Sequence, residues 1–118
     1  MERNNRETGS RYEELTAAFL EKQGYQIVEH NFRCRSGEID LIGRDGPYLV
    51  FIEVKYRSSG KSGDPAEAVD KRKQKRIVNA ARYYLYTHGY GENTPCRFDV
   101  AAILEQNVRI IKDAFSAI

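Results

Sequence analysis

Hydrophobic side chains recur at helical intervals near the start of the chain. This pattern predicts a helix over residues 11–23, carried by Tyr12, Leu15, Phe19 and Leu20. Ser10 stands three residues before Glu13, which is the spacing of a capping box, and Gly24 is a typical helix stop. Residues 1–9 are polar, and we expect them to form a flexible start to the chain.

Five further segments carry the apolar runs and alternation typical of strands. They are residues 25–32, 38–44, 48–56, 97–104 and 108–112. Asp45-Gly46-Pro47 is a turn signal, so the second and third of these strands are expected to form an antiparallel hairpin. The continuous run Leu49-Val50-Phe51-Ile52 predicts a strand that is buried on both faces.

A second helix is predicted between the third and fourth strands. Asp64 would cap it, Pro65 would take its first position, Glu67 would complete a capping box, and the helix would end near Thr87. Its apolar face consists of Ala66, Val69, Ile77, Ala80, Ala81 and Tyr84. The resulting order is α-β-β-β-α-β-β, which indicates a single α/β domain over residues 1–118 with a mixed sheet flanked by helices.

The predicted hairpin carries an unusual set of charges. Side chains two apart on a strand share a face, so Glu53 and Lys55 lie together on the third strand, and Glu38 and Asp40 lie together on the second. The turn would then bring Asp40 beside Glu53. Carboxylate oxygens suit Mg²⁺, and such an ion can activate water for attack on a phosphodiester. A simple ion pair of Lys55 with Glu53 or Asp40 at a sheet edge fits the same spacing.

Lys73 falls in the middle of the apolar face of the second predicted helix. An inward lysine either extends its stem along the core toward solvent or meets an acid, here Asp40 or Glu53, or a substrate phosphate. Gln74, at the edge of that face, is a weaker candidate for the same site. Its basic neighbours point outward and fit either a solvated helix face or a phosphate backbone.

Charge and composition exclude several classes of protein. The 118 residues carry a net charge of only +2, and no apolar run approaches the roughly 20 residues of a membrane span. The first residues lack the apolar core of a secretory signal, so we expect a cytoplasmic protein with no membrane partner. Cys34 and Cys96 show no ligand spacing with the two histidines, and they are expected to be free thiols.

Several segments together resemble the YraN family, also called UPF0102, which is assigned to the endonuclease-like PD-(D/E)xK fold. The resemblance covers residues 7–104 and is carried by Thr8-Gly9, Gly24-Tyr25, Asn31-Phe32-Arg33, Gly37-Glu38-Ile39-Asp40-Leu41-Ile42, Phe51-Ile52-Glu53-Val54-Lys55-Tyr56-Arg57, Lys73 and Arg97-Phe98-Asp99. The family is in turn similar to archaeal Holliday junction resolvases in length, element order and acidic spacing. In those enzymes a glutamate of the first helix joins the acidic set, and the matching residue here is Glu13.

This resemblance implies a nuclease that hydrolyses DNA, on branched or structured substrates, with Mg²⁺ or Mn²⁺ as cofactor. Asp40 and Glu53 would hold the metal with the Val54 carbonyl, Lys55 would position the attacking water, and Glu13 would complete the site. Glu38 and Lys73 are expected to support the site. From the distribution of charge, we also expect the outward basic residues of the second predicted helix to form the surface that contacts DNA, together with Arg33, Arg35, Arg57 and Lys61. The resemblance also implies a homodimer. Tyr12 departs from the pattern, since many relatives have glycine there, and we expect it to crowd the approach to Glu13.

Two other classes of function remain open from the sequence. A non-catalytic nucleic-acid-binding protein would keep the fold but bind no metal at the acids. A protein-interaction adaptor would instead show no affinity for DNA, and it would expose an apolar patch, for which Ala114-Phe115 is the candidate.

Overall fold

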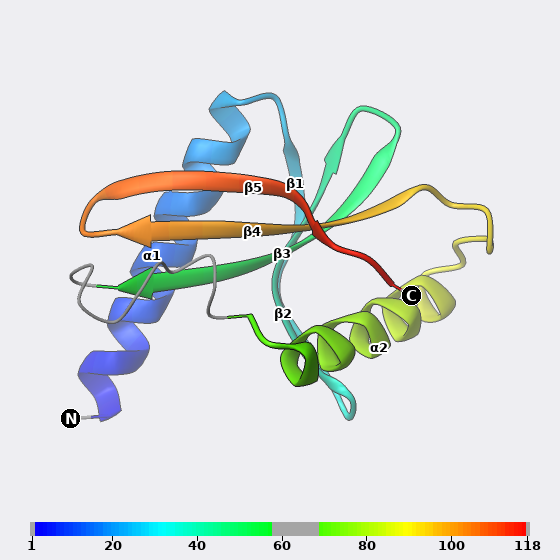
Figure 1. Cartoon of the computed structure of the whole chain (residues 1–118), viewed down its shortest axis with the longest axis horizontal. Coiled ribbons are helices and arrows are strands. Elements are labelled where there is room, and N and C mark those ends of the chain that lie inside the picture. The colour runs from blue at the N-terminus through cyan, green and yellow to red at the C-terminus, as the bar shows by residue number, and fades with distance from the viewer. Residues whose placement is uncertain (1, 58–68, 118) are drawn as a thin grey trace.

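The chain folds into one α/β arrangement, described by a computed structural model over residues 2–57 and 69–117, with side chains described from Arg11 onward. The elements run in the predicted order (Figure 1). They are α1 (Glu2–Lys22), β1 (Gln26–Cys34), β2 (Gly37–Asp45), β3 (Tyr48–Arg57), α2 (Lys71–Thr87), β4 (Cys96–Leu104) and β5 (Asn107–Phe115). No helix in these residues is long and apolar enough to cross a bilayer.

The described strands form one sheet in the order β1-β2-β3-β4-β5. Neighbouring strands are antiparallel except β3 and β4, which pair in parallel. A parallel pair needs a crossover connection, and α2 lies in the connection between these two strands. The mixed sheet and the antiparallel β2–β3 hairpin are therefore confirmed.

Each helix covers one face of the sheet, so the molecule has two cores. The α2 face holds Leu49 and Phe51 of β3 with Ile77, Ala81 and other residues of α2. The α1 face holds Val50 and Ile52 of the same strand with Ala17 and Leu20 of α1. Consecutive residues of β3 thus enter opposite cores, as predicted for a strand buried on both faces.

The start of the first helix was predicted wrongly. The helix begins at Glu2 rather than at residue 11, so residues 2–9 are helical and are no flexible start, and Ser10 lies inside the helix instead of capping it. Glutamate and arginine are good helix formers, and one glycine inside a helix costs only about 1 kcal/mol, so Gly9 does not stop it.

The start of the second helix also differs from the prediction. Val69 and Asp70 are not helical, and α2 begins at Lys71 because the Asp70 carboxylate caps it by accepting a hydrogen bond from the backbone N–H of Lys73 at 2.8 Å. The predicted cap at Asp64, with Pro65 and Glu67, lies outside the described residues, as does the predicted loop over residues 58–63. Val69 still packs in the α2-face core.

The C-terminal segment does not form the apolar patch expected of an adaptor. The Phe115 ring stacks on the Phe98 ring with their centroids 5.1 Å apart, and Phe115 packs against the α2-face core. Ala114 is exposed beside it. The C-terminal end of the described chain lies near α2 (Figure 1).

Candidate active site

Strand β3 delivers two charged side chains to the α2 face of the sheet. Glu53 follows Leu49 and Phe51 on that face and is only 4% exposed, so a carboxylate sits at the margin of an apolar core. The Lys55 ammonium lies 3.7 Å from the Glu53 carboxylate. The predicted shared face of these two residues is confirmed, and the ion pair satisfies part of the charge of a buried acid.

Asp40 meets Glu53 across the hairpin, as the sequence predicted. The paired register of β2 and β3 ends at Leu41↔Ile52, and Asp40 is the next residue along β2. Its carboxylate accepts a hydrogen bond from the backbone N–H of Val54 at 2.8 Å. Its other close partner is the carboxyl group of Glu53, with which it shares a hydrogen bond. The two acids therefore form an adjacent pair, which we call the acid pair.

Burial and mutual repulsion set the charge state of the acid pair. Loss of solvent around Asp40 raises its pKa to about 8, and the hydrogen bond and negative charge of Glu53 add to the effect. The Val54 N–H and the positive charge of Lys73 oppose the rise. Near neutral pH Asp40 thus favours its protonated form. A bound cation would instead favour two ionised carboxylates.

Helix α2 brings Lys73 to the acid pair. Its ammonium lies 3.4 Å from the Glu53 carboxylate, and its side chain is 40% exposed. Of the two roles that the sequence left open, the structure shows the contact with an acid. Gln74 has a different role, since its amide donates to the carbonyl of Val69 at 3.1 Å just before α2 begins.

Glu13 approaches the site from α1. Burial is the main cause of its raised pKa, and the negative charge of Asp40 is the next largest. The side-chain amide of Asn31 hydrogen bonds to Glu13 and opposes this rise. The ring of Tyr12, the residue before Glu13, stacks on the ring of Tyr56, with the centroids 3.9 Å apart.

Asn31 is a site residue for which sequence reasoning gave no role. Its φ is 51°, in the left-handed region, and it lies between the pairs His30↔Leu41 and Phe32↔Ile39, opposite Asp40. Leu41 belongs to the α1-face core, whereas Ile39, two residues away, belongs to the α2-face core. The regular alternation is thus interrupted at Asp40. An asparagine inside a predicted strand, where it is disfavoured, was the available signal.

Two proposed supporting residues have other contacts. Glu38 forms an ion pair with Arg33, with 3.5 Å between guanidinium and carboxylate, although its charge also raises the pKa of Glu13. The Arg57 guanidinium folds back to donate to the carbonyl of Tyr56 at 2.9 Å. Neither residue contacts the acid pair through a bond that the structure shows.

The two carboxylates of the acid pair are the smallest set of protein ligands that suits an ion such as Mg²⁺. Mg²⁺ binds hard oxygen ligands, keeps several waters, and commonly takes one or two protein carboxylates, which Asp40 and Glu53 provide. In residues 2–57 and 69–117, however, no group of three or more histidine, cysteine, aspartate or glutamate side chains is arranged to hold a metal ion. Glu13 thus influences Asp40 electrostatically without forming a three-acid cluster with the acid pair.

Comparison with known proteins assigns the chain to a family. Residues 12–103 match the profile of the uncharacterised protein family UPF0102. The chain belongs to UPF0102. A UPF0102 protein of Lachnoclostridium phytofermentans is 49% identical over 114 residues, covering 97% of each chain. One of Hahella chejuensis is 50% identical over 111 residues, covering 92% of this chain and 89% of the relative. The expected UPF0102 membership is therefore confirmed.

A second polar cluster of this UPF0102 protein lies on the α1 face, at the ends of β2 and β4. Arg97 donates to Asp99 at 2.9 Å and to Asp45 at 2.8 Å, and the Tyr25 hydroxyl donates to Asp99 at 2.8 Å. Arg97 and Asp99 are two residues apart on β4, so their side chains share a face of the strand. Asp99 is 1% exposed and also accepts from the backbone N–H of Asp113, so its charge is fully compensated. These contacts indicate that the cluster has a structural role, in which it holds β4 to the end of β2 and to Tyr25.

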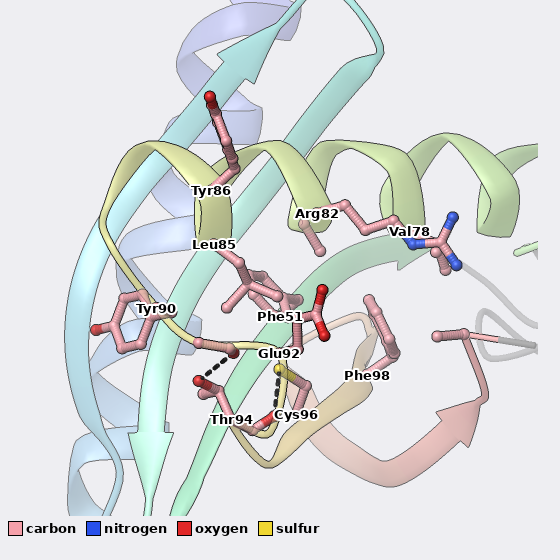
Figure 2. Close-up of a pocket in the computed structure, with 13 residues that line it drawn as sticks. Phe51, Val78, Arg82, Leu85, Tyr86, Tyr90, Glu92, Thr94, Cys96 and Phe98 are labelled. Atoms are coloured by element: carbon pink, nitrogen blue, oxygen red, sulfur yellow. Dashed lines mark hydrogen bonds between the residues drawn. The ribbon is translucent and has the colours of Figure 1, made fainter.

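An apolar hollow of about 510 Å³ lies at the C-terminal half of α2, away from the acid pair (Figure 2). Phe51, Leu85, Tyr90 and Cys96 are among its lining residues. The loop that closes it is held by a hydrogen bond from Thr94 to the carbonyl of Gly91 at 2.7 Å. No residue of the acid pair lines this hollow, so the two features are separate.

Proposed function

We propose that this UPF0102 protein is a metal-dependent nuclease of the PD-(D/E)xK type that hydrolyses phosphodiester bonds of DNA. The observation that carries the proposal is the acid pair itself. Asp40 and the buried Glu53 lie side by side, and two ammonium groups, those of Lys55 and Lys73, lie within 4 Å of Glu53. Such a concentration of charge at the margin of a core is costly, and sites of this kind commonly serve catalysis.

The residues of the site have complementary roles in this proposal. Asp40 and Glu53 would hold Mg²⁺ or Mn²⁺, which supplies a Lewis acid for the phosphoryl oxygen and lowers the pKa of water. Asp40 is held in place by the Val54 N–H, which donates a hydrogen bond to one of its carboxylate oxygens. The Val54 carbonyl is proposed as a further ligand.

The two lysines would act on the substrate side of the acid pair. Lys55 is half-buried and its ammonium lies 3.7 Å from the Glu53 carboxylate, which suits it to orient an attacking water. Lys73 is more exposed than Lys55, and this exposure suits it to neutralise a substrate phosphate. Glu13, whose pKa is raised by burial and by the negative charge of Asp40, would complete the acidic set. Branched DNA is the proposed substrate on the resemblance to resolvases alone, and dimerisation and cytoplasmic location stay predictions.

A second candidate function is a nucleic-acid-binding protein that has kept the fold without catalysis. The observation in its favour is that the described residues provide two adjacent carboxylates and no group of three. In that case Lys55 and Lys73 would serve only to neutralise the acid pair. Metal-dependent cleavage separates the two candidates.

The test is a cleavage assay with duplex, flap and four-way DNA in Mg²⁺ and in Mn²⁺. Asp40→Ala and Glu53→Gln should each lower the cleavage rate at least about 100-fold, because each removes a ligand of an ion worth several kcal/mol in the transition state. Glu92→Gln, an exposed acid outside the site, is the matched control and should cleave as the wild type does. Cleavage that survives in Asp40→Ala, or in excess chelator, would refute the proposal.

A further inference from the structure

A second hollow lies between the β1–β2 turn and the N-terminal half of α2. Its volume is about 290 Å³. We call it the basic hollow, because four of its seven lining residues are cationic and one is acidic: Arg33, Cys34, Arg35, Gly37, Glu38, Lys73 and Arg76. An open hollow with this balance of charge attracts anions.

The positive charge of the basic hollow is only partly neutralised within the protein. Arg33 is engaged by Glu38, at 3.5 Å, and Lys73 is engaged by Glu53, at 3.4 Å. Arg35 and Arg76 are exposed, and neither forms an ion pair with a carboxylate in the described part of the chain. Two guanidinium groups therefore remain to meet an anion from outside. Guanidinium groups match the oxygens of a phosphate better than an ammonium does, since they can bind two oxygens at once.

The geometry of the basic hollow depends on Gly37. A Cβ atom at this position would lie 3.1 Å from the carbonyl oxygen of Arg76 and 3.3 Å from its Cβ. The start of β2 and the helix backbone are therefore closely packed, and a side chain at this position would require a shift of a few tenths of an ångström. This contact fixes Arg76 of α2 relative to Arg35 of the turn.

Lys73 connects the basic hollow to the acid pair. Its side chain lines the hollow, and its ammonium contacts Glu53. A strand whose reacting phosphate lay at the acid pair would thus pass Lys73 and present a neighbouring phosphate to Arg35 and Arg76. We propose that the basic hollow is a binding site for a backbone phosphate of a DNA strand, an inference that rests on the proposed function and extends it to the flanking nucleotides.

The test measures DNA binding in the presence of EDTA, so that it does not depend on cleavage. The probes are a fluorescein-labelled duplex and a labelled four-way junction, followed by fluorescence anisotropy at salt concentrations from about 50 to 200 mM. The test variant is Arg35→Gln with Arg76→Gln. The matched control is Arg11→Gln with Lys22→Gln, which removes the same charge from exposed side chains of α1 that do not line the basic hollow.

We expect the test variant to bind each probe at least tenfold more weakly at the lowest salt, while the control loses less than threefold. The slope of log K against log salt should fall by about 0.9 in the test variant, because the site binds one phosphate and each neutralised phosphate contributes about 0.9. Arg35→Gln alone, which leaves α2 unchanged, should give about half of this change. It keeps the test valid if the double variant does not fold.

The outcomes distinguish this inference from the proposed function. Equal losses in the test and control variants, or absence of DNA binding by the wild type, would overturn the inference. Selective loss of binding in a protein that cleaves no DNA would leave the inference standing and remove the nuclease proposal. If the test variant alone loses DNA binding and the wild type cleaves DNA, both proposals are supported. If the wild type cleaves DNA but the test variant binds it as tightly as the wild type does, only the inference is overturned.

Discussion

Asn31 shows how one backbone conformation determines the geometry of the site. Its φ of 51° lies in a region that costs most residues about 1–2 kcal/mol, and asparagine is one of the few that tolerate it. Asn31 lies opposite Asp40, where the partner strand β2 changes face between Ile39 and Leu41. The side-chain amide then reaches Glu13. Through its backbone conformation and this hydrogen bond, Asn31 acts as a positioning residue for Asp40 and Glu13.

Substitutions at Asn31 separate these two contributions. Asn31→Gly should keep the free energy of unfolding close to that of the wild type, because glycine accepts a positive φ, whereas Asn31→Val should lower it by about 1–2 kcal/mol. In Asn31→Gly the pKa of Glu13 should rise further, since the hydrogen bond that favours its charged form is gone.

Urea denaturation measures the first effect, and an NMR titration of the Glu13 side chain measures the second. Glu105→Gly provides the control, since Glu105 also has a positive φ but lies in the β4–β5 turn. An unchanged Glu13 pKa in Asn31→Gly would rule out the positioning role.

At the scale of elements, the strand pattern predicted most of the site. Two-residue periodicity placed Glu53 beside Lys55, and the short turn after Asp45 placed Asp40 opposite Glu53. Helical periodicity placed Lys73 on the inner face of α2. These predictions succeeded because each depends on local geometry that the chain repeats over many residues.

The helix starts could not be predicted in the same way. Ser10 and Asp70 both have side chains that suit a cap, yet Ser10 lies within α1 and Asp70 begins α2. A capping side chain stabilises a helix start by only about 1 kcal/mol, so its presence does not decide whether the preceding residues are helical. The contact between Gly37 and Arg76 was also beyond prediction, because it joins elements that are distant in sequence.

The ends of three strands are held together by charge. Asp45 at the end of β2 accepts from Arg97 of β4 at 2.8 Å and from Lys112 of β5 at 3.3 Å. The hydrogen bond from Arg97 is the main reason why the pKa of Asp45 lies below its usual value. The contribution of Asp45 to stability is therefore present above the unfolded-state pKa, near 3.8, and is lost as the pH falls through the lower folded-state pKa.

Asp45→Asn should consequently destabilise the protein at pH 7 but not in acid. The expected loss at pH 7 is about 0.5–1 kcal/mol, because the carboxylate is partly exposed and screened by solvent. The difference in unfolding free energy between wild type and variant should shrink below about pH 4 and vanish near pH 2. Urea denaturation at a series of pH values measures it. A constant difference down to pH 2 would show that packing, not charge, is responsible.

At the scale of the whole molecule, the acid pair opposes stability when no cation is bound. It lies where the α2-face core ends, and the burial that raises the pKa of Asp40 also penalises its ionised form. Two lysines compensate in part, and a divalent ion would complete the compensation. Metal binding should therefore be measurable as a gain in global stability, independent of any enzymatic activity.

Mn²⁺ should raise the melting temperature of the wild-type protein at pH 8. At a concentration 100 times the dissociation constant, the gain in unfolding free energy should be about 2.7 kcal/mol. Glu53→Gln should abolish this gain, and Glu92→Gln should retain it, as measured by differential scanning calorimetry with and without the metal. The same gain in Glu53→Gln as in the wild type would place the metal elsewhere in the protein.

The parallel pairing of β3 with β4 has a consequence for the route by which the site assembles. The first three strands form a meander with short turns, so the two carboxylates can meet before the chain beyond residue 57 takes part. Lys73 belongs to the long crossover that follows, and it arrives only when that segment docks. The docking step thus adds a second ammonium group to an acid pair that Lys55 of β3 already contacts, and the attraction between Lys73 and Glu53 would guide the crossover onto the correct face of the sheet.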